Sequence, residues 1–296
     1  MVHRQQILVG AVEGALMKIL VTGGSGQLGL ALQRQAEGHD LVAFNRASLD
    51  ITDAGQVAEA LAREIPDAVI NCAAWTNVDA CEGDPEKAML VNGTAVGVLA
   101  SEAAKVGARF VQISTDYVFD GTKEGPYFED DTPNPLSAYG KSKLLGEQLA
   151  GPDALIVRTS WVMGPDGHNM LKTILRLLEG PDDLHFVDDQ RGCPTFTDDL
   201  AEVIIELLEK KGQGIFHVTN TGTVSWFQFA CAVALQSGAT TDRIRPISTE
   251  DFYPSRPAVR PMNSELKSIM LSKIRPHPLH PFEMPLSVVS QKVRKQ

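Results

Sequence analysis

A strand, a glycine-rich turn and a helix follow one another near the start of the chain, and this succession most constrains the fold. The segment beginning at Lys18 reads KILVTGGSGQLGLALQRQ, an apolar run, then glycines, then a helical pattern. Gly23, Gly26 and Gly29 have the spacing G-x-x-G-x-x-G. Glycines placed there allow a tight turn and let a pyrophosphate approach the N-terminus of the helix. The pattern predicts a dinucleotide-binding turn, with a purely structural turn as the alternative.

Apolar, strand-like runs continue to alternate with helical patterns through the first half of the chain. The run DAVIN is followed by the small residues Cys72, Ala73 and Ala74, and the run RFVQI is followed by Ser114, Thr115 and Asp116. This alternation predicts an α/β fold, a Rossmann-type doubly wound parallel sheet with a smaller C-terminal substrate lobe. Ligands of such sheets bind beyond the carboxyl ends of the strands. Small side chains at 72–74 would let a cofactor lie against the backbone, although they also suit tight helix packing.

The second predicted strand, DLVAFNR, bears on the choice of cofactor. It ends in Asn45 and Arg46, where a site that prefers NAD usually carries Asp or Glu to hold the ribose 2'-hydroxyl. Arg46 could pair instead with a 2'-phosphate, which favours NADP, but an exposed loop arginine would look the same. Asp50 could accept a hydrogen bond from the adenine amino group, or it could cap a helix that begins near Thr52.

The stretch YGKSK, residues 139–143, places a phenol and a cation four residues apart. On a helix both side chains would project from one face. A tyrosine has an ordinary pKa of about 10, and a neighbouring cation favours its ionised form. Tyr139 could then exchange a proton with a carbonyl or alkoxide oxygen. A solvated helix start is the alternative explanation for the same spacing.

Charge and cysteine usage exclude several classes of protein. The formal net charge of -10 argues against nucleic acid as a general partner, because such binding depends on neutralising phosphates. The four cysteines show neither metal-ligand nor disulfide-framework spacing. No apolar run approaches the ~20 residues that span a bilayer. We therefore expect a cytoplasmic protein with reduced thiols and no bound metal.

The pattern changes beyond Gly164, which predicts a division of the chain. Residues 17–165 and about 196–219 are expected to form the dinucleotide-binding domain, and about 166–195 with 220–296 the substrate-binding lobe. The segment 188–199 is expected to be a polar loop, and the proline-rich end from about residue 276 to be partly disordered. Met17 begins MKILVTGG, a usual start for a cytoplasmic α/β protein, so residues 1–16 are interpreted as an N-terminal extension.

Several motifs together resemble one family. They are Gly23/Gly26/Gly29, STDYVFDG at 114–121, YGKSK at 139–143, RTSWV at 158–162 and RPMNSEL at 260–266. From Met17 to about Leu271 the chain is similar to the dTDP-4-dehydrorhamnose reductases of the extended short-chain dehydrogenase/reductase superfamily. STDYVFDG is the most specific of these motifs. The resemblance implies reduction of the 4-keto group of dTDP-6-deoxy-L-lyxo-4-hexulose to dTDP-L-rhamnose, with NADPH as cofactor and NADH as the alternative.

The resemblance also implies roles for individual residues. Tyr139 would donate a proton to the nascent alkoxide, Lys143 would hold the nicotinamide ribose and lower the pKa of Tyr139, and Thr115 would orient the substrate oxygen. Asp116, Trp161, Asn169 and Arg260 would contact the substrate, with Arg260 paired to the diphosphate. The expected cofactor contacts are Gly23, Ser25, Gly26, Gln27, Leu28, Arg46, Asp50, Ile51, Cys72, Ala73, Ala74, Tyr139 and Lys143.

Two departures from related families narrow these expectations. Sugar-nucleotide 4,6-dehydratases carry an Asp-Glu pair after the Ser/Thr, whereas Tyr117 follows Asp116 here, so elimination of water is disfavoured. Members that bind a divalent ion use a glutamate in the first helix, where this chain has Leu30 and Ala31. A dTDP-sugar is the expected partner, and a homodimer is compatible with the family.

Two alternatives stay open at this stage. One is a non-catalytic NADP-binding subunit like the regulatory subunit of methionine adenosyltransferase, which retains the Tyr-x-x-x-Lys pair. The other is an epimerase or reductase acting on a related nucleotide sugar.

Overall fold

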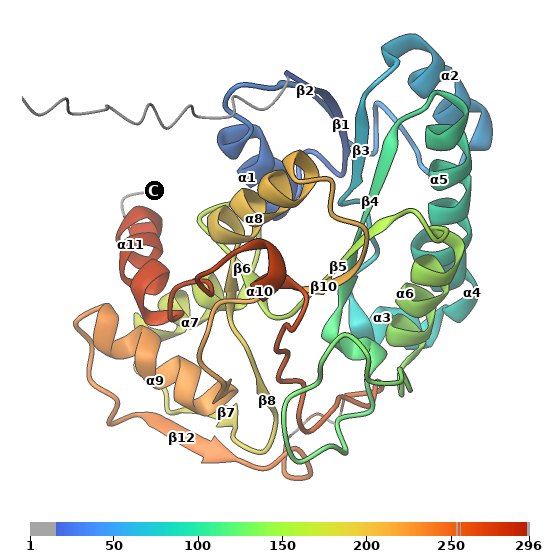
Figure 1. Cartoon of the computed structure of the whole chain (residues 1–296). Coiled ribbons are helices and arrows are strands. Elements are labelled where there is room, and N and C mark those ends of the chain that lie inside the picture. Colours follow the sequence, from blue (N-terminus) through green and yellow to red (C-terminus); the bar gives the residue numbers. More distant parts are fainter. Residues whose placement is uncertain (1–15, 253, 255, 295–296) are drawn as a thin grey trace, which may run out of the picture.

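A six-stranded parallel sheet forms the centre of the computed structural model, which describes residues 16–252, 254 and 256–294 (Figure 1). The strand order is β10-β5-β4-β3-β1-β2. All five pairings are parallel, so the predicted Rossmann-type fold is confirmed. Residues 1–15 of the predicted extension lie outside the described residues. The strands of this sheet are β1 (Lys18–Thr22), β2 (Asp40–Phe44), β3 (Ala68–Asn71), β4 (Arg109–Thr115), β5 (Leu155–Thr159) and β10 (Gly214–His217).

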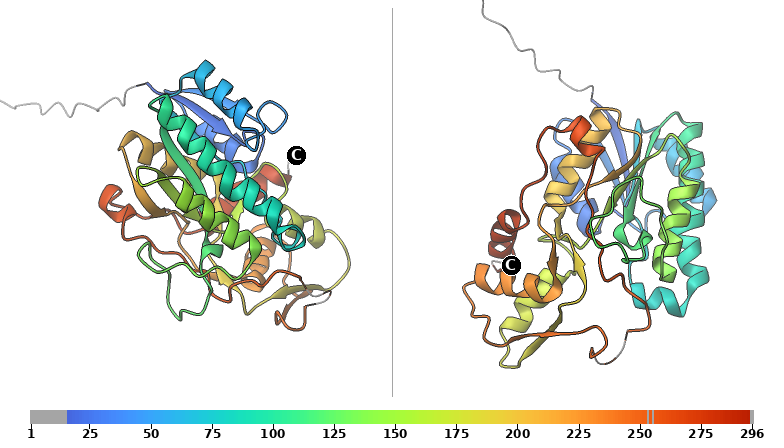
Figure 2. Two further views of the ribbon diagram at one scale, coloured as in Figure 1. Left: turned by 90° about the vertical axis from the view of Figure 1, so that its right-hand side faces the viewer. Right: turned by 60° about the horizontal axis from the view of Figure 1, so that its bottom comes forward.

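Helices cover both faces of this sheet, as two views from different sides show (Figure 2). Ile19 and Val21 of β1 pack in the cluster that includes α1 and α8, whereas Leu20 packs in the opposite cluster with α2 and α5. Successive strand residues point to opposite faces, so a strand buried on both sides must be apolar throughout. The helices of this half are α1 (Gln27–Gln35), α2 (Ala54–Glu64), α3 (Val78–Gly83), α4 (Pro85–Met89), α5 (Ala95–Lys105), α6 (Ala138–Leu149) and α8 (Thr197–Glu209).

A third hydrophobic cluster lies in the C-terminal part of the chain, around three helices. They are α7 (Met170–Leu178), α9 (Trp226–Gln236) and α11 (Glu283–Arg294). Three two-stranded sheets accompany them: β6 (Val162–Met163) with β9 (Thr195–Phe196), β7 (Leu184–Val187) with β12 (Ile244–Ile247), and β8 (Arg191–Gly192) with β11 (Val224–Ser225). A short helix, α10 (Leu271–Ile274), precedes α11. No helix in the described part of the chain is long and apolar enough to cross a membrane.

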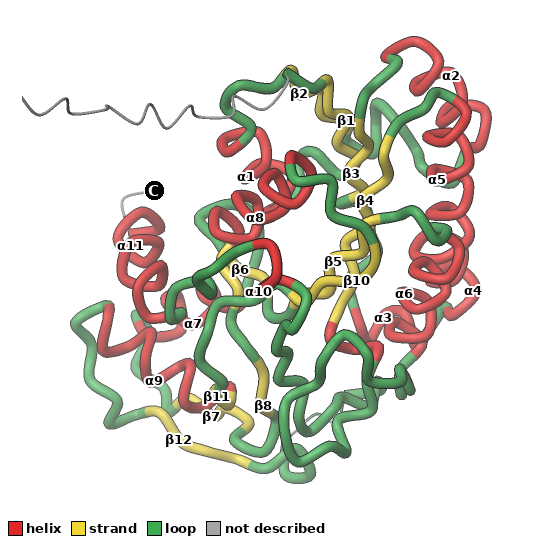
Figure 3. Tube along the Cα trace, in the orientation of Figure 1, coloured by secondary structure: helices red, strands yellow, loops and turns green. Residues whose placement is uncertain are grey.

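The structure corrects two expectations about local structure. Residues 188–199 were expected to be a loop, but they hold β8, β9 and the first turn of α8. The C-terminal segment was expected to be partly disordered, but it forms α11, whose Leu286 and Val289 are buried in the cluster with α9. Proline is tolerated in the first turn of a helix, so Pro285 does not prevent it. The segment 121–137 is a loop (Figure 3).

The helical stretch from α4 to α5 contains a π-helical turn. The turn spans Leu90–Thr94, between α4 and α5. Such turns are frequent at functional sites. Here the side chain of Asn92 points inward. Its amide oxygen accepts from the backbone nitrogen of Trp75, and its amide nitrogen donates to the carbonyl of Trp75 and to the hydroxyl of Ser142. The turn thereby ties the segment after β3 to α6.

Candidate active site

A cavity of about 490 Å³ opens at the carboxyl ends of β3, β4 and β5. It is bordered by the start of α1, by Thr115 at the end of β4, and by Tyr139 and Lys143 from α6. Parallel strands end at one edge of the sheet, which is why residues from distant parts of the sequence meet there. The remaining lining comes from Asn71, Cys72, Ala74, Thr76, Ile113, Ser114, Thr159, Ser160, Trp161, Val162, Gly167 and His168.

The glycine turn brings the backbone of β1 and α1 close to the end of β3. Gly23 has φ of +67°, and a Cβ added there would lie 2.7 Å from the nitrogen of Ala73 and from the carbonyl carbon of Cys72. A Cβ on Gly29 would collide with the carbonyl oxygen of Gly23. Gly26 is the N-cap of α1, and its position leaves the first backbone N–H groups of the helix without a side-chain cap. These groups suit an anion such as a pyrophosphate.

A second cavity, of about 320 Å³, continues from the first past the glycine turn. Gly26, Cys72 and Ala74 line both cavities. Together the two cavities are lined by all of the residues expected to contact the cofactor. Gly23, Ser25, Arg46, Asp50, Ile51 and Ala73 line the second cavity alone, and Gln27, Leu28, Tyr139 and Lys143 line the first alone.

Asp50 does not cap the following helix. Its carboxylate accepts hydrogen bonds from the backbone nitrogen and the hydroxyl of Thr52, and these bonds lower its pKa. The N-cap of α2 is Asp53, which accepts from the nitrogens of Gly55 and Gln56. Of the two roles considered for Asp50, the cap is therefore wrong, and the contact with the cofactor stays a prediction.

Tyr139 and Lys143 stand one turn apart on α6, on the face that packs against β4. The exposed fractions are 9% for Tyr139 and 3% for Lys143. Ser137 caps the helix by accepting from the nitrogen of Gly140. Lys143 donates from Nζ to the carbonyl of Ile113 at 2.6 Å, one residue before the polar end of β4. The helix start therefore holds both side chains against the end of the sheet.

Burial moves the pKa values of these two residues away from their ordinary ranges. It raises the pKa of Tyr139 strongly, and the neighbouring Thr115 hydroxyl opposes this shift. It lowers the pKa of Lys143 to about 8, with the carboxylate of Glu147 acting in the opposite direction. Desolvation therefore sets the direction of the Tyr139 pKa shift, and the ammonium of Lys143 is directed to Ile113. The lowering of this pKa by Lys143 stays a prediction.

Asp116 lies directly behind Thr115. The Thr115 hydroxyl donates to Oδ1 of Asp116 at 2.9 Å, and burial raises the pKa of Asp116 to about 6. Oδ2 of Asp116 is buried and has no hydrogen-bond partner among the described residues. Asp116 therefore takes up the one hydroxyl proton of Thr115, whose side chain lines the cavity.

Of the other expected substrate contacts, Trp161 lines the cavity around Tyr139, but Asn169 and Arg260 are not among the described residues that line it. Asn169 caps α7, and its amide nitrogen donates to Gln27 and to the carbonyl of Gly164. Arg260 pairs with Asp79, with Nη2 to Oδ2 at 2.7 Å and Nη1 to Oδ1 at 3.1 Å. Both side chains are engaged by other residues in this structure, so their contact with substrate stays a prediction.

A buried ion pair behind the site was not predicted. Glu147 accepts from Nε and Nη2 of Arg158 at 2.9 and 2.7 Å, and it also accepts from the hydroxyl of Ser114. Glu147 follows Lys143 by four residues, so it lies on the same helix face. The four-residue spacing of Tyr139 and Lys143 continues to Glu147, so the sequence carried a signal for this residue.

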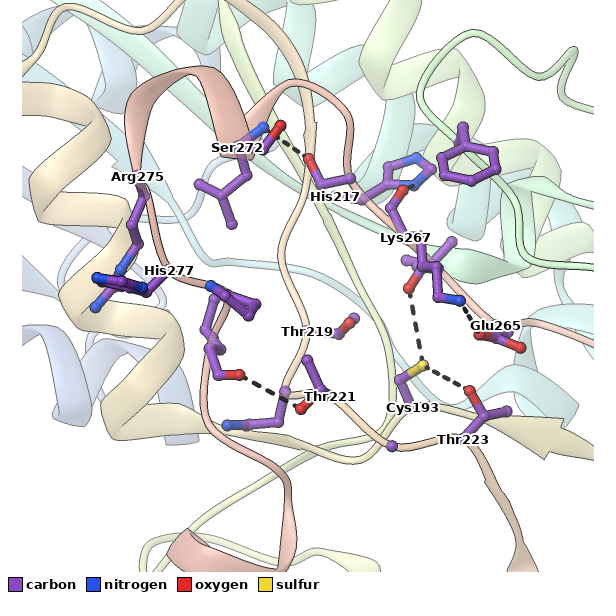
Figure 4. Close-up of a pocket in the computed structure, with 18 of the residues that line it drawn as sticks. Cys193, His217, Thr219, Thr221, Thr223, Glu265, Lys267, Ser272, Arg275 and His277 are labelled. Carbon is purple, nitrogen blue, oxygen red and sulfur yellow. Dashed lines mark hydrogen bonds and ion pairs between the residues drawn. The ribbon is translucent and has the colours of Figure 1, made fainter.

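A separate cavity, of about 310 Å³, lies near the end of β10 and includes none of the three predicted catalytic residues (Figure 4). His217 borders it, with Nδ1 near the carbonyl oxygens of Tyr127 and Lys267. Carbonyls only accept hydrogen bonds, so Nδ1 carries the proton. Burial lowers the pKa of His217 to about 4. A neutral histidine held between two loops has a structural role here.

Among the described residues there is no group of three or more His, Cys, Asp or Glu side chains that could hold a metal ion. All four cysteines are free thiols. Burial raises the pKa of Cys72 to about 12, so this cavity-lining thiol is not a nucleophile at neutral pH.

The sheet, the glycine turn and the Tyr-x-x-x-Lys helix define the class of extended short-chain dehydrogenases/reductases. The family model described as RmlD substrate binding domain matches residues 17–294, and the chain belongs to this family.

Named relatives agree with this assignment. The spore coat polysaccharide biosynthesis protein SpsK of Bacillus subtilis is 43% identical over 268 residues, covering 88% of this chain and 93% of that protein. A dTDP-4-dehydrorhamnose reductase of Burkholderia thailandensis is 41% identical over 277 residues, covering 87% and 92%. The crystal structure of a dTDP-4-dehydrorhamnose reductase from Bacillus anthracis in complex with NADP superposes with a TM-score of 0.89. It is 35% identical and covers 93% of this chain and 98% of that chain.

Proposed function

We propose that this protein is a dTDP-4-dehydrorhamnose reductase. It reduces the 4-keto group of dTDP-6-deoxy-L-lyxo-4-hexulose to dTDP-L-rhamnose, with NADPH as the reductant. The observation that carries the proposal is one cavity lined by the start of α1, Thr115, Tyr139 and Lys143. The names of the Burkholderia and Bacillus anthracis relatives and the NADP bound to the latter support it.

The residues present fit a dinucleotide cofactor. Gly23 leaves open the space that a Cβ would fill against Ala73, and the two adjoining cavities share the wall formed by Gly26, Cys72 and Ala74. Arg46 lines the far cavity, where it would pair with a 2'-phosphate. When bound, NADPH would supply the hydride that reduces C4 of the sugar.

Tyr139 is the proton donor in this proposal. Its raised pKa keeps the phenol protonated at neutral pH, so it can give its proton to the oxygen on C4 as that oxygen becomes an alkoxide. The O–H bond of Tyr139 breaks and a hydroxyl forms on the sugar. The one hydroxyl proton of Thr115 goes to Asp116 in this structure. When the substrate binds, Thr115 would turn this proton to the same oxygen and stabilise its developing charge. Lys143 would hold the nicotinamide ribose.

The identity of the residue after Asp116 favours carbonyl reduction over elimination of water. A dehydration needs a second acid–base group there, but Tyr117 occupies the position and burial raises its pKa to about 12. It therefore stays a neutral phenol, which cannot act as a base near neutral pH. Carbonyl reduction needs only the groups already described.

A coupled assay tests the proposal. The dTDP-4-keto sugar is made in situ from dTDP-glucose with the upstream dehydratase and epimerase, and loss of NADPH absorbance is followed after addition of this protein. We expect oxidation of NADPH only when the keto sugar is present. Tight binding of NADPH without turnover would contradict the proposal and favour the regulatory-subunit alternative. Turnover only with a different nucleotide sugar would favour the related reductase or epimerase.

We also propose that the protein works in the cytoplasm and, as a further prediction, that it forms a homodimer. The free thiols and the absence of a membrane-spanning helix among the described residues support the first statement. Light scattering coupled to size-exclusion chromatography measures the second, and a monomer mass at working concentration would contradict it.

A further inference from the structure

Two tryptophans stack face to face at the wall of the cavity that holds Tyr139. The ring centroids of Trp161 and Trp226 lie 3.5 Å apart, and their planes differ by 4°. Trp161 lines the cavity, whereas Trp226 is not among the described residues that do. Trp226 therefore covers the face of Trp161 that is turned away from the cavity.

The backbone of Trp161 is strained, so neighbouring residues must hold it in place. Its φ of +45° lies in the left-handed region, which is unfavourable for a side chain of this size. Such a conformation persists only when the surrounding structure enforces it. Here Ser160 donates to the carbonyl of Cys193 at 2.7 Å, and the nitrogen of Thr195 donates to the carbonyl of Trp161 at 3.2 Å.

A small two-stranded sheet supplies the support from two sides. Gly192 of β8 lies so close to the indole of Trp161 that an added Cβ would be 2.6 Å from Nε1. Val224 of β11 pairs with Gly192, and two residues later Trp226 begins α9. The pairing of β8 with β11 thus positions both Gly192, which contacts the indole of Trp161, and Trp226, on which that indole stacks.

Trp226 is itself held firmly. Ser225 and Gln228 form a capping box at the start of α9, with reciprocal hydrogen bonds of 3.1 and 2.9 Å. The ring of Trp226 also meets Phe229 edge to face, at 6.3 Å between centroids, and Phe229 is fully buried. Because these contacts hold the ring of Trp226 in place, that ring can also hold the indole of Trp161 in place.

We infer that Trp226 is a positioning residue that holds the Trp161 indole as a rigid wall on which the apolar C–H face of the hexose packs. This inference rests on the proposed function. Pyranose C–H groups gain dispersion energy against a flat aromatic surface, and a ring held in place loses no rotamer freedom when the sugar binds. Without Trp226 the strained Trp161 would relax out of the wall.

Kinetics of Trp226→Ala and Trp226→Phe test this role, with Leu235→Ala as the control because Leu235 is 67% exposed on the same helix. Loss of one aromatic pair is expected to raise KM for the keto sugar roughly tenfold, equivalent to about 1.4 kcal/mol. The kcat and the Kd for NADPH should stay near wild type. Trp226→Phe keeps an aromatic ring, so its KM should lie close to that of the wild type. A folded Trp226→Ala protein with wild-type KM, or with a loss in kcat alone, would overturn the inference.

Circular dichroism of the cofactor-free protein gives a second test that does not depend on turnover. The chain has three tryptophans. Two indoles fixed against each other should contribute near-UV circular dichroism that is lost in Trp161→Phe and in Trp226→Phe to the same extent but is kept in Trp75→Phe. A near-UV spectrum that Trp226→Phe leaves unchanged would overturn the inference even if Trp226→Ala fails to fold.

The two tests separate the inference from the proposed function. If the wild type turns over the keto sugar and Trp226→Ala keeps its KM, the inference is wrong and the function stands. If the wild type does not turn over the keto sugar, the function is wrong, and the role of the pair in sugar binding is wrong with it.

Discussion

Tyr139 and Lys143 are both buried, and burial favours the neutral form of each. For the tyrosine this raises the pKa, so the phenol keeps the proton that a developing alkoxide needs. For the lysine it lowers the pKa to about 8, so its charge depends on the carboxylate of Glu147 one turn further along α6. At the scale of single residues, the chemistry therefore depends on a helix face of three ionisable groups.

Replacing Tyr139 by Phe removes the proton donor and leaves the ring. We expect kcat to fall roughly 10²–10⁴-fold, the usual contribution of general acid catalysis, with an unchanged Kd for NADPH. Tyr127→Phe is the matched control, because it also removes a buried hydroxyl, one that donates to Asp120 at 2.9 Å. Steady-state kinetics with a fluorescence titration of NADPH measures both quantities. Near-wild-type turnover of Tyr139→Phe would show that the proton comes from another group.

Replacing Glu147 by Gln should change the pH dependence of activity. The folded pKa of Lys143 lies below its ordinary value, so its charge is present below about pH 8 and is lost as the pH rises through that value. Glu147 raises this pKa, so its removal should move the alkaline limb of the kcat/KM profile to lower pH. The variant should also be less stable by about 3–5 kcal/mol, because the Arg158 guanidinium loses its buried partner. An alkaline limb that does not move would contradict the role of Glu147.

At the scale of elements, the turn between β1 and α1 and the C-terminal helix α11 each depend on a close contact with a remote segment. The turn approaches the backbone that follows β3, and α11 packs its buried residues against α9. Neither contact is local in sequence. Each contact can be tested by two substitutions on the same or a similar element, one at a residue that makes the remote contact and one at a residue that does not.

Gly23→Ala and Gly38→Ala form the first pair. Both glycines have positive φ, +67° and +87°, so both substitutions carry a strain of about 1–2 kcal/mol. Only Gly23 has backbone within 2.7 Å of the added Cβ, whereas nothing lies within 4 Å at Gly38. We expect Gly23→Ala to weaken NADPH binding at least tenfold, about 1.4 kcal/mol, because the walls of the cofactor cavity must move apart. Calorimetric titration should show no such loss for Gly38→Ala, and equal losses in both would contradict this explanation.

Leu286→Ala and Val288→Ala form the second pair, both on α11. Leu286 is 0% exposed and Val288 is 53% exposed. Truncating a buried leucine should lower the free energy of unfolding by about 2–5 kcal/mol, while the exposed site should change it by less than about 0.5 kcal/mol. Urea denaturation measures both. A Leu286→Ala protein as stable as the wild type would show that α11 does not contribute to the core.

At the scale of the whole molecule, local patterns predicted the central sheet, because each strand, turn and helix start is encoded in a short stretch such as the one at Gly23 or Tyr139. Contacts between distant segments could not be predicted. Arg260 pairs with Asp79, which is 181 positions away, and Trp161 stacks on Trp226 from another element. The apolar residues of α11 find partners only once α9 is in place, so a proline-rich, basic segment gave no local sign of order. The cofactor side of the cleft was therefore more predictable than the substrate side.

Isotope labelling of the hydride tests the proposed reduction most directly. NADPH that carries deuterium at the transferred position is incubated with the protein and the dTDP-4-keto sugar, and the product is examined by NMR. Direct hydride transfer predicts dTDP-L-rhamnose with deuterium at C4 and one NADPH consumed for each sugar reduced. NADPH that binds but is not oxidised, or a sugar changed without net consumption of NADPH, would contradict it.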